Sequence, residues 1–96
     1  LSQFARSIQA AKAAVLSDPD SRYSAGLADI FRQDFTTGGG RIVADQTFRA
    51  GDATFATQLA AIKAAAPDVI FLPAYYPDAA RVIREAREAG IDVPFL

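Results

Sequence analysis

The sequence contains no cysteine, histidine, methionine or tryptophan. Without cysteine, the chain has no disulfide, no thiol nucleophile and no cysteine metal site. Without histidine, it lacks the usual general base and the commonest metal ligand, so Ser-His-Asp and Cys-His triads are excluded within this chain. We therefore expect a protein that is not an enzyme, with no catalytic residues, no metal site and no cofactor.

Charge and hydropathy exclude further classes of protein. The net charge is −1, so the chain has no basic surface with which to hold nucleic acid. Its longest apolar runs fall far short of the ~20 residues that a membrane-spanning helix needs. Hydrophobic residues make up 51% and charged residues 22% of the 96 positions, a balance typical of a globular domain rather than a disordered segment.

Both ends of the sequence lie inside patterned segments. Phe4 and Ile8, four residues apart, are typical of one face of a helix that ends near residue 9. Leu96 closes an apolar run that begins at Val93. Since natural domains rarely begin and end within such segments, we expect residues 1–96 to be a single α/β domain that forms part of a larger protein.

Helices and strands alternate along the rest of the chain. Short apolar runs predict strands at residues 12–17, 41–48 and 69–72 and the beginning of a fourth at 93–96. Helical periodicity predicts helices from about residue 21 to 37, between Asp52 and Pro67, and between Pro77 and Gly90. Their expected apolar faces are Leu27, Ile30, Phe31 and Phe35; Phe55, Leu59, Ile62 and Ala66; and Val82, Ile83 and Ala86.

Caps and turns mark the boundaries of these helices. Asp20 or Ser21 is expected to cap the first of them, and Asp52 the second. Three glycines at residues 38–40 are expected to end the first helix. They do not predict a phosphate-binding loop, because such loops lie between a strand and the following helix.

Strict alternation with short loops predicts a parallel sheet with right-handed crossovers, in a Rossmann-like three-layer αβα fold. The usual strand order places the second strand outside the first and the third on its other side. Tyr23 follows the first strand and Tyr75 follows the third, so we expect the two rings to meet at the ligand-binding edge. Tyr23 and Tyr75 are therefore the predicted ligand-binding residues.

Other interpretations of these loops stay open. Each tyrosine could instead pack its ring on the sheet edge and tie down a loop through its hydroxyl. Tyr76 is expected to point elsewhere and to have a mostly structural role. Asp18 and Asp20 are typical of turn and cap chemistry, and they offer too few oxygens for a metal site.

Several short motifs occur in a characteristic order. They are Tyr23-x-x-Gly26-Leu27, Gly39-Gly40, Gly51-Asp52-x-x-Phe55, the run PDVIFLPAYYP at residues 67–77 and the run AREAGI at residues 86–91. Their order and spacing resemble the second lobe of the periplasmic branched-chain amino-acid-binding proteins, the type I solute-binding proteins of ABC importers. The resemblance covers nearly the whole chain.

This resemblance implies an extracytoplasmic protein of two α/β lobes that close over a small amino acid or related carboxylate. In such proteins the first lobe supplies hydroxyl and backbone groups for the ligand's carboxylate and ammonium. The second lobe supplies aromatic residues at the positions of Tyr23 and Tyr75, and a carboxylate that would lie beyond Leu96. The implied partners are the ligand, the first lobe and a membrane permease. Ser24 departs from the pattern, which usually has glycine there.

Three alternative functions remain. A ligand-sensing domain of a receptor or regulator would have the same fold and is not separated from transport by these residues. A flavodoxin-like or nucleotide-binding enzyme domain would need a glycine- or hydroxyl-rich phosphate loop after the first strand, for which residues 18–22 are poorly suited. A receiver-type signalling domain would need an acidic residue after the third strand, where Pro73, Ala74 and Tyr75 stand.

Overall fold

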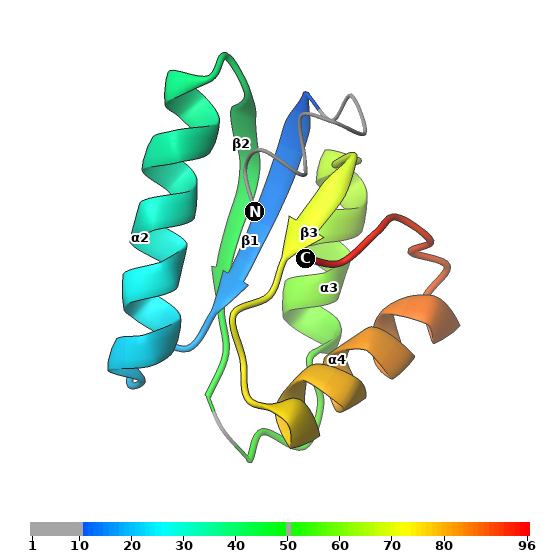
Figure 1. The fold of residues 1–96 in the computed structure, drawn as a ribbon. Coiled ribbons are helices and arrows are strands. Elements are labelled where there is room, and N and C mark those ends of the chain that lie inside the picture. The colour runs from blue at the N-terminus through cyan, green and yellow to red at the C-terminus, as the bar shows by residue number, and fades with distance from the viewer. Residues whose placement is uncertain (1–10, 50) are drawn as a thin grey trace.

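A computed structural model describes residues 11–49 and 51–96 of the chain, and the helix expected at residues 2–9 lies outside them. Three parallel strands form the sheet in the order β2-β1-β3 (Figure 1). They alternate with three helices along the chain. The elements are β1 (Lys12–Ser17), α2 (Arg22–Thr37), β2 (Arg41–Thr47), α3 (Ala56–Ala65), β3 (Val69–Phe71) and α4 (Tyr76–Glu88).

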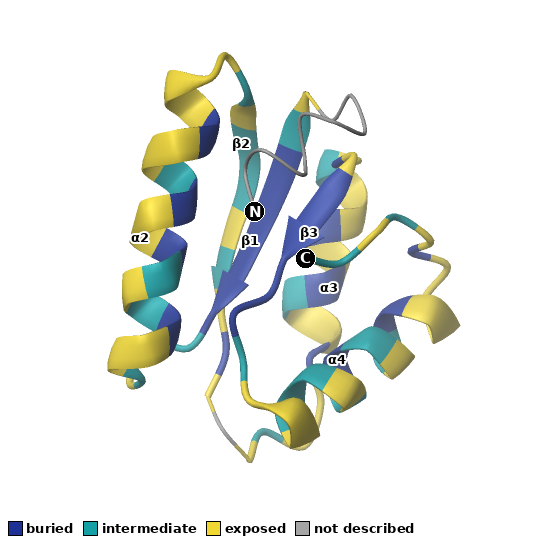
Figure 2. Cartoon of the chain, viewed as in Figure 1, coloured by how far each residue is buried: buried dark blue, intermediate teal, exposed yellow. Residues whose placement is uncertain are grey.

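The core lies on both faces of the sheet, as the predicted three-layer αβα fold requires. On β1, Ala13 and Val15 pack with Phe31 and Phe35 of α2. The alternate residues of β1 point to the opposite face, because side chains alternate along a strand; there Ala14 and Leu16 join the residues of α3 and α4. Figure 2 shows the buried side of each helix turned toward the sheet. The predicted fold class and strand order are therefore confirmed.

The apolar face of α2 differs in part from the sequence prediction. Its buried residues are Ser24, Ala28, Phe31 and Phe35, a spacing of four, three and four that follows one side of a helix. Ile30 is 59% exposed, because each residue of a helix is rotated by about 100° from the one before and Ile30 falls outside this stripe. The placement of Ile30 in the core was wrong, whereas Ser21 caps the helix as expected.

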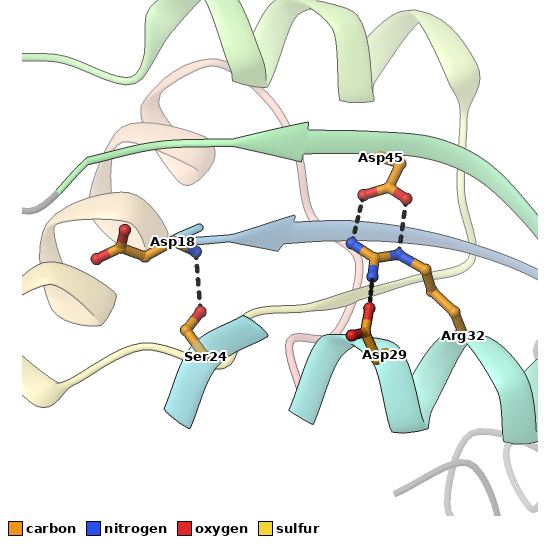
Figure 3. Close-up of polar contacts among 5 residues, drawn as sticks. All are labelled: Asp18, Ser24, Asp29, Arg32 and Asp45. Atoms are coloured by element: carbon orange, nitrogen blue, oxygen red, sulfur yellow. Dashed lines mark hydrogen bonds and ion pairs between the residues drawn. The ribbon is translucent and has the colours of Figure 1, made fainter. Parts of the chain in front are cut away.

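Polar contacts fasten α2 to the outer strand. The guanidinium of Arg32 donates from Nε and Nη2 to the carboxylate of Asp45 on β2, at 2.7 and 2.9 Å, and from Nη1 to Asp29 at 2.7 Å (Figure 3). The hydrogen bonds with Asp45, more than the neighbouring charges, raise the pKa of Arg32 above its usual value. This bidentate geometry is the stronger form of an otherwise weak surface ion pair.

The predicted cap of α3 was wrong. The helix begins after Phe55, and the carboxylate of Asp52 instead accepts the backbone N–H of Arg49 at 2.9 Å within the preceding turn. Glu85 of α4 supplies the missing acceptor. Its carboxylate accepts the Phe55 N–H at 3.1 Å and the Thr54 hydroxyl at 2.7 Å.

The other end of α3 also differs from the prediction. Ala66 was expected on the apolar face, but it is exposed and adopts a left-handed conformation with φ of 52°. It therefore serves as the C-cap, in the position where helices commonly take this conformation. Pro67 follows immediately, so the predicted end of the helix is confirmed.

The segment at residues 93–96 runs beside β3. It pairs through one parallel bridge between Ile70 and Phe95, with the Leu96 N–H donating to the Ile70 carbonyl at 2.9 Å. The expected fourth strand is thus present as a single bridge rather than a full strand. None of the helices in the described ranges is both long and apolar enough to cross a membrane.

Replacing Glu85 with alanine should lower the free energy of unfolding by about 1–2 kcal/mol, because the N-terminus of α3 loses its acceptor. Urea denaturation measures this change. Glu88→Ala is the matched control, since Glu88 is an exposed residue of the same helix. Equal effects of the two substitutions would contradict the capping role of Glu85.

Candidate functional site

Parallel strands place the loops that follow them at one edge of the sheet. Their described residues are 18–21 after β1, 48–49 and 51–55 after β2, and 72–75 after β3. In Figure 1 they lie together at the end of the sheet where α2 and α4 begin. Ligands of open α/β sheets bind at this carboxyl edge, beside the point where the strand order reverses. Here that point lies between β1 and β3.

Tyr23 and Tyr75 meet at this edge. Tyr23 is in the first turn of α2, and Tyr75 is the N-cap residue of α4. Their ring centroids are 5.2 Å apart and the planes are inclined by 21°, a stacked arrangement. The predicted proximity of the two rings is therefore confirmed, although they lie 52 positions apart in the sequence.

The stacked pair is open to solvent. Tyr23 is 51% and Tyr75 is 62% exposed. Within the described ranges, neither hydroxyl forms a hydrogen bond with the protein, so the two hydroxyls do not tie down their loops. The pair thus presents a flat aromatic surface with two hydroxyl groups, the kind of wall that lines small-molecule sites.

Tyr76 does not fill the structural role expected of it. It is the first residue of α4 and is 82% exposed. A ring so far out of the core contributes little packing. Only Pro77, in the first turn, matches the expected helix start, since its fixed φ suits that position.

The loop between β1 and α2, which precedes Tyr23, is organised around Asp18. Its carboxylate accepts the Asp20 N–H at 2.9 Å and its carbonyl accepts the Ser21 N–H at 3.2 Å. These are the turn contacts expected of the two aspartates. The Asp18 N–H donates to the hydroxyl of Ser24 at 2.8 Å (Figure 3). Sequence analysis assigned roles to residues near Ser24 but none to its hydroxyl.

Two arginines contact these loops, and sequence reasoning missed both contacts. Arg49 forms an ion pair with Asp20, which joins the loop after β2 to the loop after β1. Arg81 of α4 donates to the backbone carbonyl of Asp52, and its guanidinium lies 5.0 Å from the centre of the Phe55 ring. The pair of Arg49 and Asp20 is exposed and contributes little stability.

The described residues form no metal site, and a surface pocket lies away from the two tyrosines. Among the residues that the structure describes, no three His, Cys, Asp or Glu side chains gather closely enough to hold a metal ion. A surface pocket of about 210 Å³ lies at the ends of α3 and α4, lined by Lys63, Ala66, Pro67, Gly90, Ile91, Asp92 and Val93. Those residues precede β3 or follow α4, so the pocket is at the opposite edge from the tyrosines.

Residues 1–96 match the model of the family described as periplasmic binding protein. Among curated relatives, the chain is 29% identical over 89 residues to an amino acid binding protein of Pseudomonas aeruginosa. It is 28% identical over 75 residues to the Leu/Ile/Val-binding protein of Escherichia coli. These alignments include 93% and 78% of the chain but only 24% and 20% of the relatives, so the chain spans about a quarter of their length or less.

Solved structures give the same result. The leucine-binding protein LivK of Thermotoga maritima superposes on 98% of the chain with a TM-score of 0.93 and 34% identity. LivJ of Streptococcus pneumoniae, solved with isoleucine, superposes on 95% with a TM-score of 0.87 and 37% identity. The chain covers 27% and 25% of these two proteins. The matches favour a solute-binding protein over the flavodoxin-like, nucleotide-binding and receiver alternatives.

The stack should be visible by near-ultraviolet circular dichroism, since the chain has three tyrosines and no tryptophan. Rings held in one orientation give such a signal, and mobile rings do not. Either Tyr23→Ala or Tyr75→Ala should remove most of the tyrosine band, because each substitution also releases the partner ring. Tyr76→Ala is the control and should retain the band. Loss of the band in the control alone would show that the stack does not form.

Proposed function

Because the chain belongs to the periplasmic binding protein family, we propose that it is part of one lobe of the solute-binding component of an ABC transporter. The complete protein binds a small amino acid or a related carboxylate in the cleft between its two lobes. This function requires three partners: the ligand, the first lobe of the same protein and a membrane permease. It also requires an extracytoplasmic location, which for this family is the periplasm.

The stacked pair of Tyr23 and Tyr75 is the observation that carries this proposal. The rings lie 5.2 Å apart at the switch point of the sheet and remain more than half exposed. Leaving two aromatic rings in water forgoes the free energy of their burial, so the arrangement is most useful if another surface covers it. A small ligand held under a second lobe would provide that cover.

Closure of a second lobe supplies the rest of the mechanism. The rings form one apolar wall for a ligand side chain, and their hydroxyls offer hydrogen bonds at its polar end. Closure of a two-lobe protein about a hinge excludes water from the cleft and brings the remaining polar groups to the ligand. The chain itself contributes binding groups and no reacting group.

Relatives support a branched-chain amino acid as the ligand. The similar proteins include a leucine-binding protein, a Leu/Ile/Val-binding protein and a transporter protein solved with isoleucine. An aliphatic side chain also suits the flat aromatic wall, because both surfaces are apolar. We therefore take L-leucine as the first ligand to test.

In the complete protein, Tyr75→Ala should weaken the binding of L-leucine by roughly 10- to 100-fold, because truncation of a buried aromatic anchor commonly has effects of this size. Tyr76→Ala should change the affinity by less than about threefold, as expected of a residue at the edge of an interface. Isothermal titration calorimetry measures both. Equal effects of the two substitutions would mean that the wrong ring has been assigned.

The 96-residue chain alone should bind L-leucine very weakly or not at all, because the groups expected to hold the carboxylate and ammonium belong to the other lobe or lie beyond Leu96. Calorimetry of the isolated chain checks this, with circular dichroism to establish that it is folded. A submillimolar dissociation constant would show that the tyrosine surface is a complete site by itself.

A further inference from the structure

Ser24 is a buried polar residue directly beside a predicted ligand-binding residue. It follows Tyr23 in the first turn of α2, and only 1% of its surface is exposed. Buried hydroxyl groups cost free energy unless they form hydrogen bonds. The Ser24 hydroxyl accepts the N–H of Asp18 at 2.8 Å, across a separation of six residues (Figure 3).

This hydrogen bond closes the turn between β1 and α2. Asp18 is the first residue after β1, and its N–H points to Ser24 rather than continuing the strand pairing. The backbone N–H of Ser24 donates in turn to the hydroxyl of Ser21 at 3.2 Å. The two serines therefore fix both the end of the strand and the beginning of the helix.

The direction of the Tyr23 ring depends on this turn. Among the described residues, the Tyr23 hydroxyl forms no hydrogen bond that would anchor the ring. The ring is thus placed by its own backbone and by stacking on Tyr75. Stacking of a single aromatic pair is a modest interaction, so the alignment of the ring also depends on an ordered backbone.

We propose that Ser24 is a positioning residue for the ligand site: its buried hydroxyl holds the turn that carries Tyr23 and so keeps the two tyrosine rings aligned for the ligand. This inference rests on the proposed function, in which Tyr23 contacts the ligand. A glycine at position 24 would lack the hydroxyl and leave the Asp18 N–H without this acceptor.

A double-mutant cycle in the complete protein tests the proposal. Its variants are Ser24→Ala, Tyr23→Ala and the double substitution, with L-leucine affinity measured by calorimetry. Ser24→Ala removes only the hydroxyl and adds no bulk, so it should fold. Arg32→Gln is the matched control, because it breaks polar contacts of the same helix with Asp29 and Asp45, two turns away from Ser24.

Ser24→Ala should weaken binding by roughly three- to tenfold, because ligand binding must then order a turn that the lost hydrogen bond held in advance, and the free energy of one such bond corresponds to about that factor. In the Tyr23→Ala background, the same substitution should change the affinity by less than about twofold, since coupled residues do not add. Arg32→Gln should leave the affinity unchanged. Amide exchange at Asp18, measured by NMR, should be slow in the wild type and faster in Ser24→Ala.

Distinct outcomes overturn the inference. If Ser24→Ala binds L-leucine as the wild type does, or if its loss is the same with and without Tyr23, Ser24 does not act through that ring. A similar loss in Arg32→Gln would show that any weakening of α2 reduces binding, which also contradicts the proposal. If the wild type binds no L-leucine, or if Tyr23→Ala has no effect, the proposed site itself fails and the role of Ser24 falls with it.

Discussion

The parallel pairing of β1 with both β2 and β3 is the constraint on which the arrangement of the tyrosine edge depends. Because all three strands point the same way, each ends at the same edge of the sheet and is followed there by a loop. Strand β3 joins the opposite side of β1 from β2, which creates the switch point. Tyr23 and Tyr75 become neighbours through this topology, since nothing in their local sequence relates them.

The contacts around this edge differ in strength. The sheet is covered on both faces by apolar side chains, and this burial supplies most of the stability of such a domain. The exposed ion pair of Arg49 and Asp20 links two loops but contributes little. The Ser24 hydroxyl and the Glu85 carboxylate act where backbone N–H groups would otherwise lack acceptors, so their removal costs more.

Strands, helix ends and one helix cap depend on nearby residues, and local sequence patterns predicted them. Periodicity and turn residues predicted the strands at 12–17 and 69–72, the second of which ends at Phe71, together with a cap at Asp20 or Ser21 and the helix stops. The strand order followed from the alternation of elements. Asp52 was expected to cap α3 because aspartate is a favoured N-cap residue, whereas the actual acceptor, Glu85, lies 30 residues from Phe55. Ile30 was misplaced because hydrophobicity was given more weight than helical phase.

The ligand role of Tyr23 and Tyr75 stays a prediction, because half of the proposed cleft belongs to another lobe. The most direct measurement is an isotope-filtered NOE experiment on the complete protein with ¹³C-labelled L-leucine. If the two rings line the site, cross-peaks will run from the leucine methyl groups to the ring protons of both Tyr23 and Tyr75, and none to Tyr76. Bound leucine with cross-peaks to neither Tyr23 nor Tyr75 would contradict their ligand role.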